Sequence, residues 1–310
     1  MADVDRLPLV IAVLTFRRPR DLADIVPALV EQAASVDADV EILVVDNDPD
    51  AGAVAQVRAF AREHPVRYVH EPAPGIAAAR NRALEESDAA RLLVFIDDDE
   101  RPEPGWLGLL LETWRRNRAA AVVGPVISRF DEQPDEWIAA GRFFDRRRMP
   151  TGTRVEVAAT NNLLLDLDVV RRTGARFDAR FGISGGSDSV FTRYLHARGG
   201  ELVWCDEAVV HDIVPADRMT RDWVLRRAYR IGNAWSRINL TGVTVGGRAI
   251  VRARMLLRGS IRVFAGSVRF VAGFVTRRLV DRARGLRTAA RGAGMLTGAV
   301  GSVYSEYKRT

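Results

Sequence analysis

Three adjacent aspartates, Asp97, Asp98 and Asp99, stand directly after the apolar run Leu92–Ile96. Such a run is typical of a buried strand, and a loop rich in proline and glycine, 101–106, follows the acids. Neighbouring carboxylates repel one another and are costly to remove from water, so they need solvent or a cation. Hard divalent cations that bridge phosphates prefer oxygen ligands of this kind. The strand end therefore favours a metal and phosphate site over the alternative, a solvated acidic turn.

A second acidic position, Asp188, follows a stretch that contains Gly182, Gly185 and Gly186. These glycines form a loop that lets the backbone approach a ligand closely. Asp188 also opens a helical pattern over 190–197, so it could simply cap that helix. The other hypothesis is a general base, a carboxylate that removes a proton from a substrate. The local sequence supports both equally.

His211 follows the apolar residues Ala208–Val210, again at a predicted strand end. A lone histidine in this position is more often a hydrogen-bonded structural residue. Beside a carboxylate-bound metal, however, the imidazole is a suitable further ligand. The other histidines, His64, His70 and His196, lack such a context.

The elements that would position these side chains alternate between strand and helix over the first 125 residues. This pattern predicts an α/β fold, a parallel sheet with helices on both faces. Asp46 ends another predicted strand, and ligands of such sheets bind outside the carboxyl ends of the strands. No glycine-rich phosphate loop is present, which disfavours dehydrogenases and P-loop enzymes but not a nucleotide held through a metal-bridged diphosphate. The predicted strands are 9–14, 40–45, 66–69, 92–96 and 120–126, and the predicted helices are 19–33, 51–62, 74–86 and 105–117.

Length and composition indicate a globular catalytic domain with an appendage. The 310 residues slightly exceed one compact core, and 47% apolar with 28% charged residues argue against disorder. A single cysteine, Cys205, excludes an intrachain disulfide and favours a reducing compartment. The first residues lack the pattern of a secretion signal.

Charge is unevenly distributed along the chain. Residues 241–310 carry fourteen basic and two acidic side chains, whereas residues 1–240 carry 32 basic and 38 acidic ones. This asymmetry indicates a polyanion or an anionic membrane as the partner of the tail. The tail has few aromatic residues for base stacking and no recognition module, which disfavours nucleic acid.

A helix placed over 250–282 separates apolar residues on one side from Arg258, Arg262 and Arg269 on the other. Arginines interrupt every apolar run before the roughly 20 residues that a spanning helix needs. The pattern predicts a helix lying in the interface of an anionic membrane, with a second, weaker helix over 288–305. The alternative is a helix packed on the catalytic domain with a solvated arginine face. The apolar side comprises Leu257, Ile261, Phe264, Val268, Val271 and Val275.

Eight motifs, in order over about two hundred residues, resemble the family 2 inverting glycosyltransferases, which have the GT-A nucleotide-sugar fold. The segment from Val210 to Gly232 is similar, more narrowly, to bacterial exopolysaccharide transferases of the succinoglycan-assembly type. The motifs are Val13-Leu-Thr-Phe-Arg-Arg-Pro19, Val44-Val-Asp-Asn-Asp48, Pro74-Gly-Ile-Ala-Ala-Ala-Arg-Asn-Arg82, Phe95-Ile-Asp-Asp-Asp99, Pro104-Gly-Trp-Leu107, Thr160-Asn-Asn-Leu163, Phe181-Gly-Ile-Ser-Gly-Gly-Ser-Asp188 and His211.

The resemblance implies roles on the donor side. Asp97 would face the ribose or sugar, and Asp99 would bind Mn²⁺ or Mg²⁺, with His211 completing the metal site. The metal would neutralise the leaving diphosphate. The positions implied in nucleotide-sugar binding are Thr15, Arg17, Asp46, Arg80, Asp97 and Asp98, of which Asp46 would accept hydrogen bonds from the base and Asp98 has no separate task.

On the acceptor side, the resemblance makes Asp188 the base that deprotonates the acceptor hydroxyl, in one displacement that inverts the anomeric carbon. Ser187 departs from the family, which usually has glutamate there, and this affects acceptor contacts more than the base. A QxxRW motif and transmembrane helices, both typical of processive synthases, are missing, so the resemblance implies addition of one sugar. The acceptor-side positions are Trp106, Asn161, Asn162, Gly185, Gly186 and Ser187.

Together these inferences predict a catalytic domain over 1–215, with a donor half to about 125 and an acceptor half after it. A helical connector over 216–245 and basic amphipathic helices over 246–310 would follow, on the cytoplasmic face of the membrane. The predicted reaction transfers sugar from a nucleotide-diphosphate donor, a UDP-sugar by resemblance, to a lipid-linked glycan or glycolipid. The alternatives are a polyprenyl-phosphate sugar transferase of the same fold and an inactive sugar- or nucleotide-binding scaffold, and homo-oligomerisation is open. A sugar-nucleotide pyrophosphorylase is disfavoured because its glycine-rich opening is missing.

Overall fold

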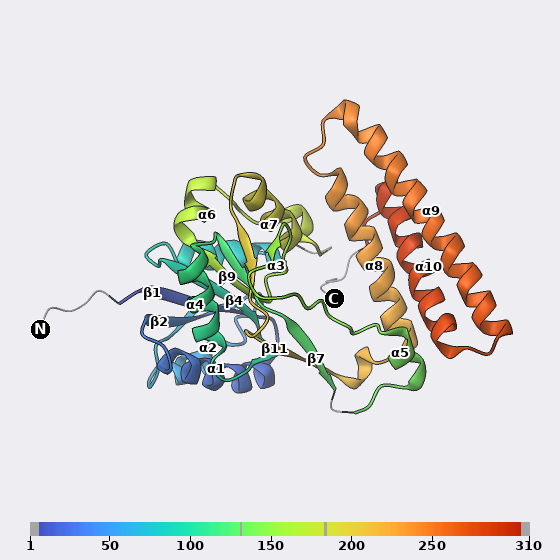
Figure 1. The fold of residues 1–310 in the computed structure, drawn as a ribbon. Coiled ribbons are helices and arrows are strands. Elements are labelled where there is room, and N and C mark those ends of the chain that lie inside the picture. Colours follow the sequence, from blue (N-terminus) through green and yellow to red (C-terminus); the bar gives the residue numbers. More distant parts are fainter. Residues whose placement is uncertain (1–5, 131, 183–184, 305–310) are drawn as a thin grey trace, which may run out of the picture. The chain divides into compact units, whose positions relative to one another are not determined.

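An eight-stranded sheet carries the α/β part of the chain in the computed structural model, which describes residues 6–130, 132–182 and 185–304 (Figure 1). Its order is β3-β2-β1-β4-β9-β6-β10-β8. The first four strands in this order are parallel, as the sequence predicts, and β9 runs antiparallel between β4 and β6. The strands are β1 (Pro8–Thr15), β2 (Asp39–Asp46), β3 (Val66–His70), β4 (Leu92–Asp97), β6 (Ala121–Val123), β8 (Arg154–Val155), β9 (Asn162–Asp166) and β10 (Leu202–Trp204).

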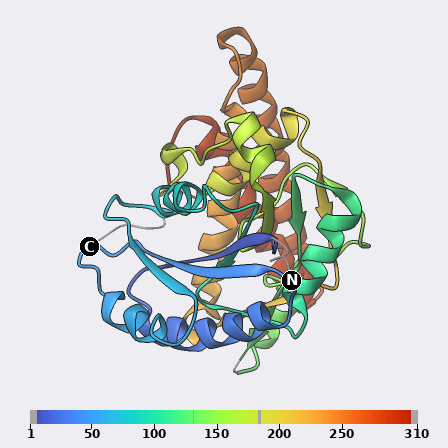
Figure 2. The ribbon, with the colours of Figure 1, turned by 90° about the vertical axis from the view of Figure 1, so that its left-hand side faces the viewer.

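Helices bury both faces of this sheet, which explains why its central strands are apolar throughout. In β1, Leu9 and Ile11 pack in the core formed with α1, α2 and α4, whereas Val10 and Ala12 pack in the core formed with α3, α6 and α7. Parallel strands covered on both faces are continuous rather than alternating in hydrophobicity. Figure 2 shows α1 and α2, in blue, along one side of the blue strands. The helices are α1 (Pro19–Ala34), α2 (Val54–Phe60), α3 (Ile76–Glu86), α4 (Trp106–Asn117), α6 (Leu167–Thr173) and α7 (Ser187–Ala197).

The register of the sheet brings polar strand ends to one edge. Leu14 of β1 lies opposite Asp97 of β4, and Thr15 lies opposite Asp46 of β2. The last side chains of three neighbouring strands therefore meet at the carboxyl edge, where the sequence predicts the site.

A second, smaller sheet begins just after β4, where β5 pairs with β11 in antiparallel orientation. The three-stranded sheet β5-β11-β7 consists of β5 (Glu100–Pro102), β11 (Val210–Val214) and β7 (Val126–Phe130). His211 lies opposite Arg101 in this pairing. The strand β5 is not predicted from the sequence, because Glu100–Pro102 reads as loop in isolation and is extended only by its partner.

The predicted strand 120–126 is divided into β6 and β7. A Cβ on Gly124 would overlap the carbonyl oxygen of Ala208 and the amide of Asn162, so the chain passes too close to its neighbours to carry a side chain here. Pro125 follows and cannot donate to a strand ladder.

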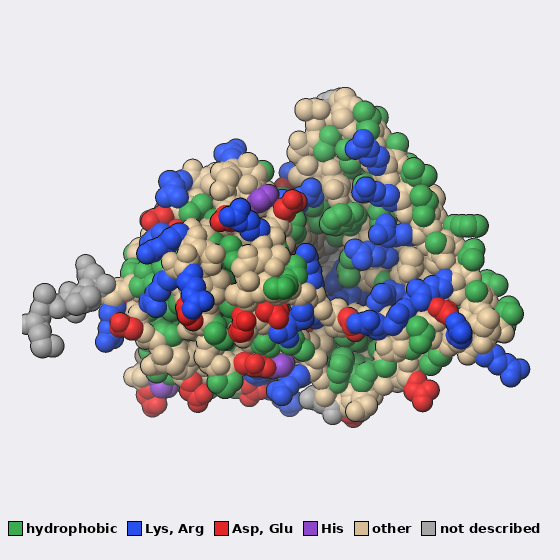
Figure 3. Space-filling view, viewed as in Figure 1, with side chains coloured by type: hydrophobic (Ala, Val, Ile, Leu, Met, Phe, Trp, Pro, Cys, Tyr) green, Lys and Arg blue, Asp and Glu red, His purple; other side chains and the backbone are tan. Residues whose placement is uncertain are grey.

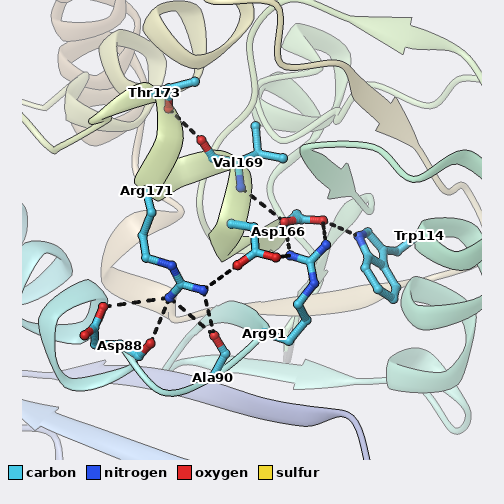
Figure 4. A network of polar contacts seen from close by, with 9 residues as sticks. Asp88, Ala90, Arg91, Trp114, Asp166, Val169, Arg171 and Thr173 are labelled. Carbon is cyan, nitrogen blue, oxygen red and sulfur yellow. Dashed lines mark hydrogen bonds and ion pairs between the residues drawn. The ribbon is translucent and has the colours of Figure 1, made fainter.

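At the opposite, amino end of β4, a buried ion pair fixes β4 against β9 (Figure 4). Arg91 binds both carboxylate oxygens of Asp166, and the indole N–H of Trp114 donates to the same carboxylate over 3.2 Å. Asp166 also caps α6 by accepting from the backbone N–H of Val169 over 3.2 Å. Because every oxygen is hydrogen-bonded, this buried charge is compensated and fixes the register of two core strands.

A second compact unit comprises residues 128–145, 184–186 and 214–310. Within it, Trp137 and Ile138 pack with Phe144, Val224 and Ala283 in one apolar cluster. Segments far apart in the sequence therefore share this core. Its helices are α5 (Glu136–Gly141), α8 (Arg221–Leu240), α9 (Val245–Val275) and α10 (Leu279–Ala299).

The helix α10 packs against α8 on one side and α9 on the other, through glycines. A Cβ on Gly294 would overlap the carbonyl oxygen of Tyr229 in α8, and one on Gly285 would lie 2.6 Å from the backbone nitrogen of Phe270 in α9. On α9, Gly259, Gly266 and Gly273 repeat every seven residues along the same contact. The missing side chains let the helix backbones approach closely.

The bounds of these helices differ from those predicted for the tail. The helix expected over 250–282 ends at Val275, and the one expected over 288–305 begins at Leu279. Arg277, with φ 55°, makes the left-handed turn between them, a conformation that arginine does not signal in a sequence. Among the described residues, no helix is both long and apolar enough to cross a membrane.

Candidate active site

Asp97, Asp98 and Asp99 form the acid run, and the carboxylate of Asp98 is held within it by two side chains. It is 3% exposed and accepts from the hydroxyl of Thr15 over 2.8 Å and from Nη1 of Arg18 over 2.8 Å. The same Arg18 nitrogen lies 2.8 Å from Oδ2 of Asp99. The ends of β1 and β4 are thus tied together by one hydroxyl and one guanidinium.

Burial and mutual repulsion perturb the run. Burial raises the pKa of Asp97 to about 7, with Asp99 and Asp98 adding to the rise and Arg80 and Arg18 opposing it. Burial likewise raises the pKa of Asp98 to about 6, against the effects of Arg18 and Thr15. Carboxyl groups with raised pKa values at a strand edge are typical of functional sites.

Glu100 extends the acid run below the surface. It is 1% exposed, and its carboxylate accepts from the backbone N–H of Asp97 over 3.0 Å and from the amide of Asn161 over 2.7 Å. Burial raises the pKa of Glu100 well above its usual range. Glu100 therefore connects the end of β4 to the chain just before β9.

Asp46 is fully buried and fixes the loop after β2. Its carboxylate accepts from the backbone N–H groups of Asp48 and Ala53, each over 2.9 Å, and from the hydroxyl of Tyr68 over 3.1 Å. Burial, followed by the charge of Asp46 and its hydrogen bond, raises the pKa of Tyr68 to about 12. In this structure the hydrogen bonds of the Asp46 carboxylate are therefore made to the protein itself.

Arg17 lies at the surface beside this loop. Its guanidinium donates to Asp48 over 3.0 Å and to Asp50 over 2.8 Å. Its backbone has φ 56°, which turns the chain between β1 and α1.

Arg80 lies between the carboxyl edge of the sheet and the start of α7. It is 8% exposed, and its Nη1 donates to the hydroxyl of Ser187 over 2.9 Å, while its charge lowers the pKa of Asp97. Asp188 is the next residue in α7, and its carboxylate accepts from the backbone N–H of Ser189 over 2.7 Å. Arg80 thus contacts the residue before Asp188 and acts on Asp97 of the acid run, although the two are some ninety residues apart.

The imidazole of His211 is oriented by Glu103. Its Nε2 lies 2.7 Å from Oε1 of Glu103, so the hydrogen bond assigns the proton to Nε2. Nδ1 is buried and has no hydrogen-bond partner within residues 6–130, 132–182 and 185–304, which leaves a lone pair available. Since His211 lies opposite Arg101 and Ile213 donates to the carbonyl of Asp99 over 3.4 Å, His211 and Asp99 share one face of the strand pair.

These groups fit a metal that a diphosphate helps to hold. Among the residues that the structure describes, no cluster of three or more histidine, cysteine, aspartate or glutamate side chains forms a ready-made metal cage. Mg²⁺, however, usually binds proteins through one or two carboxylates together with substrate phosphates and water. Asp99 and the unpartnered Nδ1 of His211 could serve such a metal.

Two of the predicted acceptor-side residues lie in the core. Trp106 is completely buried, and its indole N–H donates to the side-chain oxygen of Asn162 over 2.9 Å. Asn162 in turn donates to the carbonyl groups of Pro125 and Ala208. In this structure neither side chain is accessible to an acceptor, because both are buried and their polar groups form hydrogen bonds inside the protein.

The remaining acceptor-side positions lie near the start of α7 or beside Glu100. Ser187 is buried beneath Arg80, and Asn161 is hydrogen-bonded to Glu100. Gly185 and Gly186 have φ values of 76° and 98°, which favour glycine. Ile183 and Ser184 of the predicted loop lie outside the described residues.

Sequence reasoning missed Arg18, Glu100 and Asn47. The side chain of Asn47 donates to the carbonyl groups of Glu71 and Ala73 and accepts from the N–H of Gly75, so it holds the loop before α3. The partners of Asn47 lie 24 to 28 residues away, so no local pattern points to this role. For Arg18, the adjacent Arg17 and Arg18 are equivalent in sequence, and only the fold decides which one faces the acids.

Comparison with known proteins agrees with this architecture. The chain is 35% identical over 230 residues to the succinoglycan biosynthesis protein ExoM of Rhizobium meliloti (strain 1021), covering 74% of each chain. Among solved structures it is similar to GalNAc-T7, determined with UDP, GalNAc and Mn²⁺, with a TM-score of 0.54 and 14% identity. That match covers 76% of this chain and 51% of the other, so the chain spans about half the length of GalNAc-T7.

A second structural match is residues 1–349 of TarS from S. aureus in complex with UDP-GlcNAc. Its TM-score is 0.51 at 13% identity, and it covers 96% of this chain and 93% of the other. At these identities the two structures support the GT-A-like fold alone. The sequence profile described as Glycosyl transferase family 2 matches residues 10–170, over half of the chain. With this match and the relationship to ExoM, the chain belongs to glycosyltransferase family 2, enzymes that use nucleotide sugars.

Proposed function

We propose that the protein transfers one sugar, with inversion, from a UDP-sugar to a hydroxyl group of a lipid-linked glycan or glycolipid. The carboxyl edge of the sheet supports the proposed binding of this donor. There, Thr15 and Arg18 hold the carboxylate of Asp98 in place by hydrogen bonds. The related ExoM is a succinoglycan biosynthesis protein, and the TarS structure contains UDP-GlcNAc. The class of reaction is a glycosyl transfer whose leaving group is a nucleoside diphosphate.

Asp188 is the proposed general base. It would accept the proton of the acceptor hydroxyl as that oxygen attacks the anomeric carbon from the side opposite the diphosphate. The bond to the diphosphate breaks in the same step, so the configuration inverts once. Asp188 lies in the first turn of α7.

Asp99 and His211 are the proposed ligands of Mn²⁺ or Mg²⁺. When bound, the metal would act as a Lewis acid on the charge that develops on the diphosphate. Asp97 would contact the ribose or sugar, and Arg80 would add a cation beside the phosphates. Arg80 is buried and Asp97 half-buried at this edge, where weaker solvent screening strengthens electrostatic interactions.

The observation that carries the proposal is the position of Arg80. One guanidinium acts on Asp97 at the donor edge and donates to Ser187, the residue before the proposed base. This contact supports the proposal, because a single displacement requires the donor-binding and base functions, some ninety residues apart in the chain, to lie at one place.

The decisive experiment measures nucleotide release from a panel of UDP-sugars with Mn²⁺ or Mg²⁺ and membrane extract as acceptor. We expect Asp188→Asn to lower the rate by at least about a hundredfold, because general-base catalysis contributes about 10²–10⁴-fold, while UDP binding stays within about twofold. Asp222→Asn, at an exposed aspartate of α8, is the matched control and should retain full activity. Full activity of Asp188→Asn, or of the wild type in excess chelator, would contradict the mechanism.

The alternative, transfer to a polyprenyl phosphate, would give a product whose sugar is linked through a monophosphate. Mild acid releases such a sugar, whereas a glycosidic bond to a glycan hydroxyl survives. An inactive binding scaffold would show nucleotide binding without release in any combination of donor and acceptor.

The proposed membrane partner is supported by the exposed face of α9. Leu257, Phe264 and Val275 are 63%, 74% and 75% exposed, and from Leu257 to Val275 the spacing of the stripe alternates between four and three residues. This α9 stripe comprises Ile250, Leu257, Ile261, Phe264, Val268, Val271 and Val275, all more than half exposed. It lies on the side of the helix opposite Gly259, Gly266 and Gly273, which face α10.

Arginines flank the α9 stripe. Arg254, Arg258 and Arg269 are exposed on α9, and Figure 3 shows basic side chains gathered over the tail helices. An apolar stripe edged by arginines suits the interface of an anionic membrane, where acyl chains meet negative headgroups. We propose that α9 brings the enzyme to the cytoplasmic membrane face, where a lipid-linked acceptor would be found.

A further inference from the structure

Arg18 lies where helix electrostatics disfavours a cation. It is the residue before Pro19, the first residue of α1, and no side chain caps this end of the helix. A helix N-terminus carries partial positive charge and favours anions. The position is stable because Asp98 and Asp99 compensate the guanidinium.

The two contacts of Arg18 differ in how firmly the acid is held. Nη1 lies 2.8 Å from Oδ1 of Asp98 and 2.8 Å from Oδ2 of Asp99. The Asp98 side chain is 5% exposed and also bound by Thr15, whereas the Asp99 side chain is 19% exposed. The Arg18 side chain itself is 36% exposed, so it has room to move towards solvent. The contact with Asp99 is the one that can be exchanged.

We propose that Arg18 is an internal counterion that competes with the metal for Asp99 and makes metal and nucleoside diphosphate bind cooperatively. This inference rests on the proposed role of Asp99 in the preceding subsection. Two cations at one carboxylate repel each other, so a metal arriving alone must displace Arg18 without compensation. A metal arriving with a diphosphate brings negative oxygens, to which the released guanidinium can donate.

The test is a titration of the full-length protein with Mn²⁺, followed by electron paramagnetic resonance, with and without UDP. In the wild type we expect UDP to tighten Mn²⁺ binding by at least about tenfold, which corresponds to about 1.4 kcal/mol of coupling. Arg18→Met should bind Mn²⁺ about tenfold more tightly than the wild type without UDP. With the Mn²⁺ affinity in the presence of UDP expected to stay near that of the wild type, the tightening by UDP should shrink by the same factor, and by reciprocity so should the tightening of UDP binding by Mn²⁺.

Three variants complete the design. Arg20→Met removes one charge from an exposed position two residues away and should leave both affinities within about twofold of the wild type. Arg18→Lys keeps a cation and should retain most of the coupling. Since Arg18→Met leaves the buried Asp98 without its partner, the double variant Arg18→Met/Asp98→Asn removes both charges and should show the same gain in Mn²⁺ affinity if the single variant does not fold.

The outcomes separate this inference from the proposed function. If the wild type binds Mn²⁺ with UDP but the Arg18 variants show no gain without UDP, the counterion role is wrong and the metal site stands. If no form binds Mn²⁺ even with UDP, both the metal site and the counterion role are wrong. A rise in Mn²⁺ affinity in Arg20→Met equal to that in Arg18→Met would reduce the effect to general charge and also overturn the inference.

Discussion

Each carboxylate of the acid run has a different surrounding, although the three are neighbours in the chain. Asp98 is held by Thr15 and Arg18, Asp99 shares Arg18 and lies on the strand face of His211, and Asp97 is under the influence of Arg80. Asp97 ends β4, whereas Asp98 and Asp99 form the turn that follows, and this turn presents both of their carboxylates to Arg18. A run of like residues can therefore supply an anchor and two ligand-facing groups.

The raised pKa of Asp97 predicts how metal-free stability depends on pH. The folded protein holds a proton on Asp97 up to about pH 7, whereas the unfolded chain releases it near 3.8. Between these values the folded state binds more protons, so stability falls as pH rises. In excess chelator, the urea midpoint should decrease from about pH 4 to about pH 7, and Asp97→Asn should reduce the decrease.

The matched control for this prediction is Asp222→Asn, on the exposed face of α8. It should leave the pH profile as in the wild type. A profile of Asp97→Asn parallel to that of the wild type would show that Asp97 is ionised in the folded protein throughout this range.

The sequence points to the candidate site residues themselves, but not to the residues that contact them in the fold. Acids at strand ends indicate a cation or a phosphate group by chemistry alone, and Asp188 and His211 follow from motifs. The contacts of Arg18 and Glu100 depend on residues about eighty and sixty positions away, which no local pattern specifies. The burial of Trp106 against Asn162 could not be predicted for the same reason, because the two are 56 residues apart.

At the scale of elements, alternating strands and helices were predictable because both sheet faces are covered. The insertion of β9 antiparallel between β4 and β6 was not, since its apolar residues Leu163–Leu165 fit either direction. In the tail, hydrophobicity located the α9 stripe correctly, but glycine rather than hydrophobicity determines where the helices touch. Small residues leave little trace in a hydrophobic pattern.

The close approach of α10 to α8 predicts opposite effects for two glycine substitutions. Gly294→Ala puts a methyl group onto the carbonyl oxygen of Tyr229 and should destabilise the protein by about 1–3 kcal/mol. Gly246→Ala, near the start of α9 with no atom within 4 Å of the added Cβ, should stabilise it by up to about 1 kcal/mol. Urea unfolding monitored by circular dichroism measures both.

These substitutions are chemically identical and both lie in helices, so each serves as the control for the other. Equal stabilities of the two variants would mean that α10 does not approach α8 as closely as described.

At the scale of the whole molecule, charge and apolar surface coincide in the tail. Net positive charge is concentrated after residue 240, and the α9 stripe exposes its apolar side chains there. Removing the tail after residue 245 is a poor test of the proposed membrane contact, because α8 would lose the helix that packs on Gly232. Substitutions confined to the stripe avoid this problem.

We expect Phe264→Ser/Val271→Ser to weaken sedimentation with phosphatidylglycerol vesicles by at least about tenfold, since each side chain loses part of about 1.5–3 kcal/mol of apolar burial. Ile231→Ser/Trp235→Ser on α8, which are 41% and 40% exposed, is the matched control and should bind as the wild type does. Binding of the wild type should fall with salt and be weak to phosphatidylcholine.

Equal loss in both double variants would argue against the α9 stripe as the contact surface. Self-association of the wild type without lipid, abolished by Phe264→Ser/Val271→Ser, would instead identify the stripe as an interface between copies of this chain.

The central place of α10 among the tail helices has a consequence for synthesis on the ribosome. The chain makes α8 and α9 before α10, the helix that packs between them through glycine. Until α10 emerges, both earlier helices present unpaired contact faces, and the cluster around Trp137 and Phe144 lacks Ala283. Folding of this unit therefore waits for a late segment, and a pause before α10 would leave the nascent chain open to aggregation or chaperone binding.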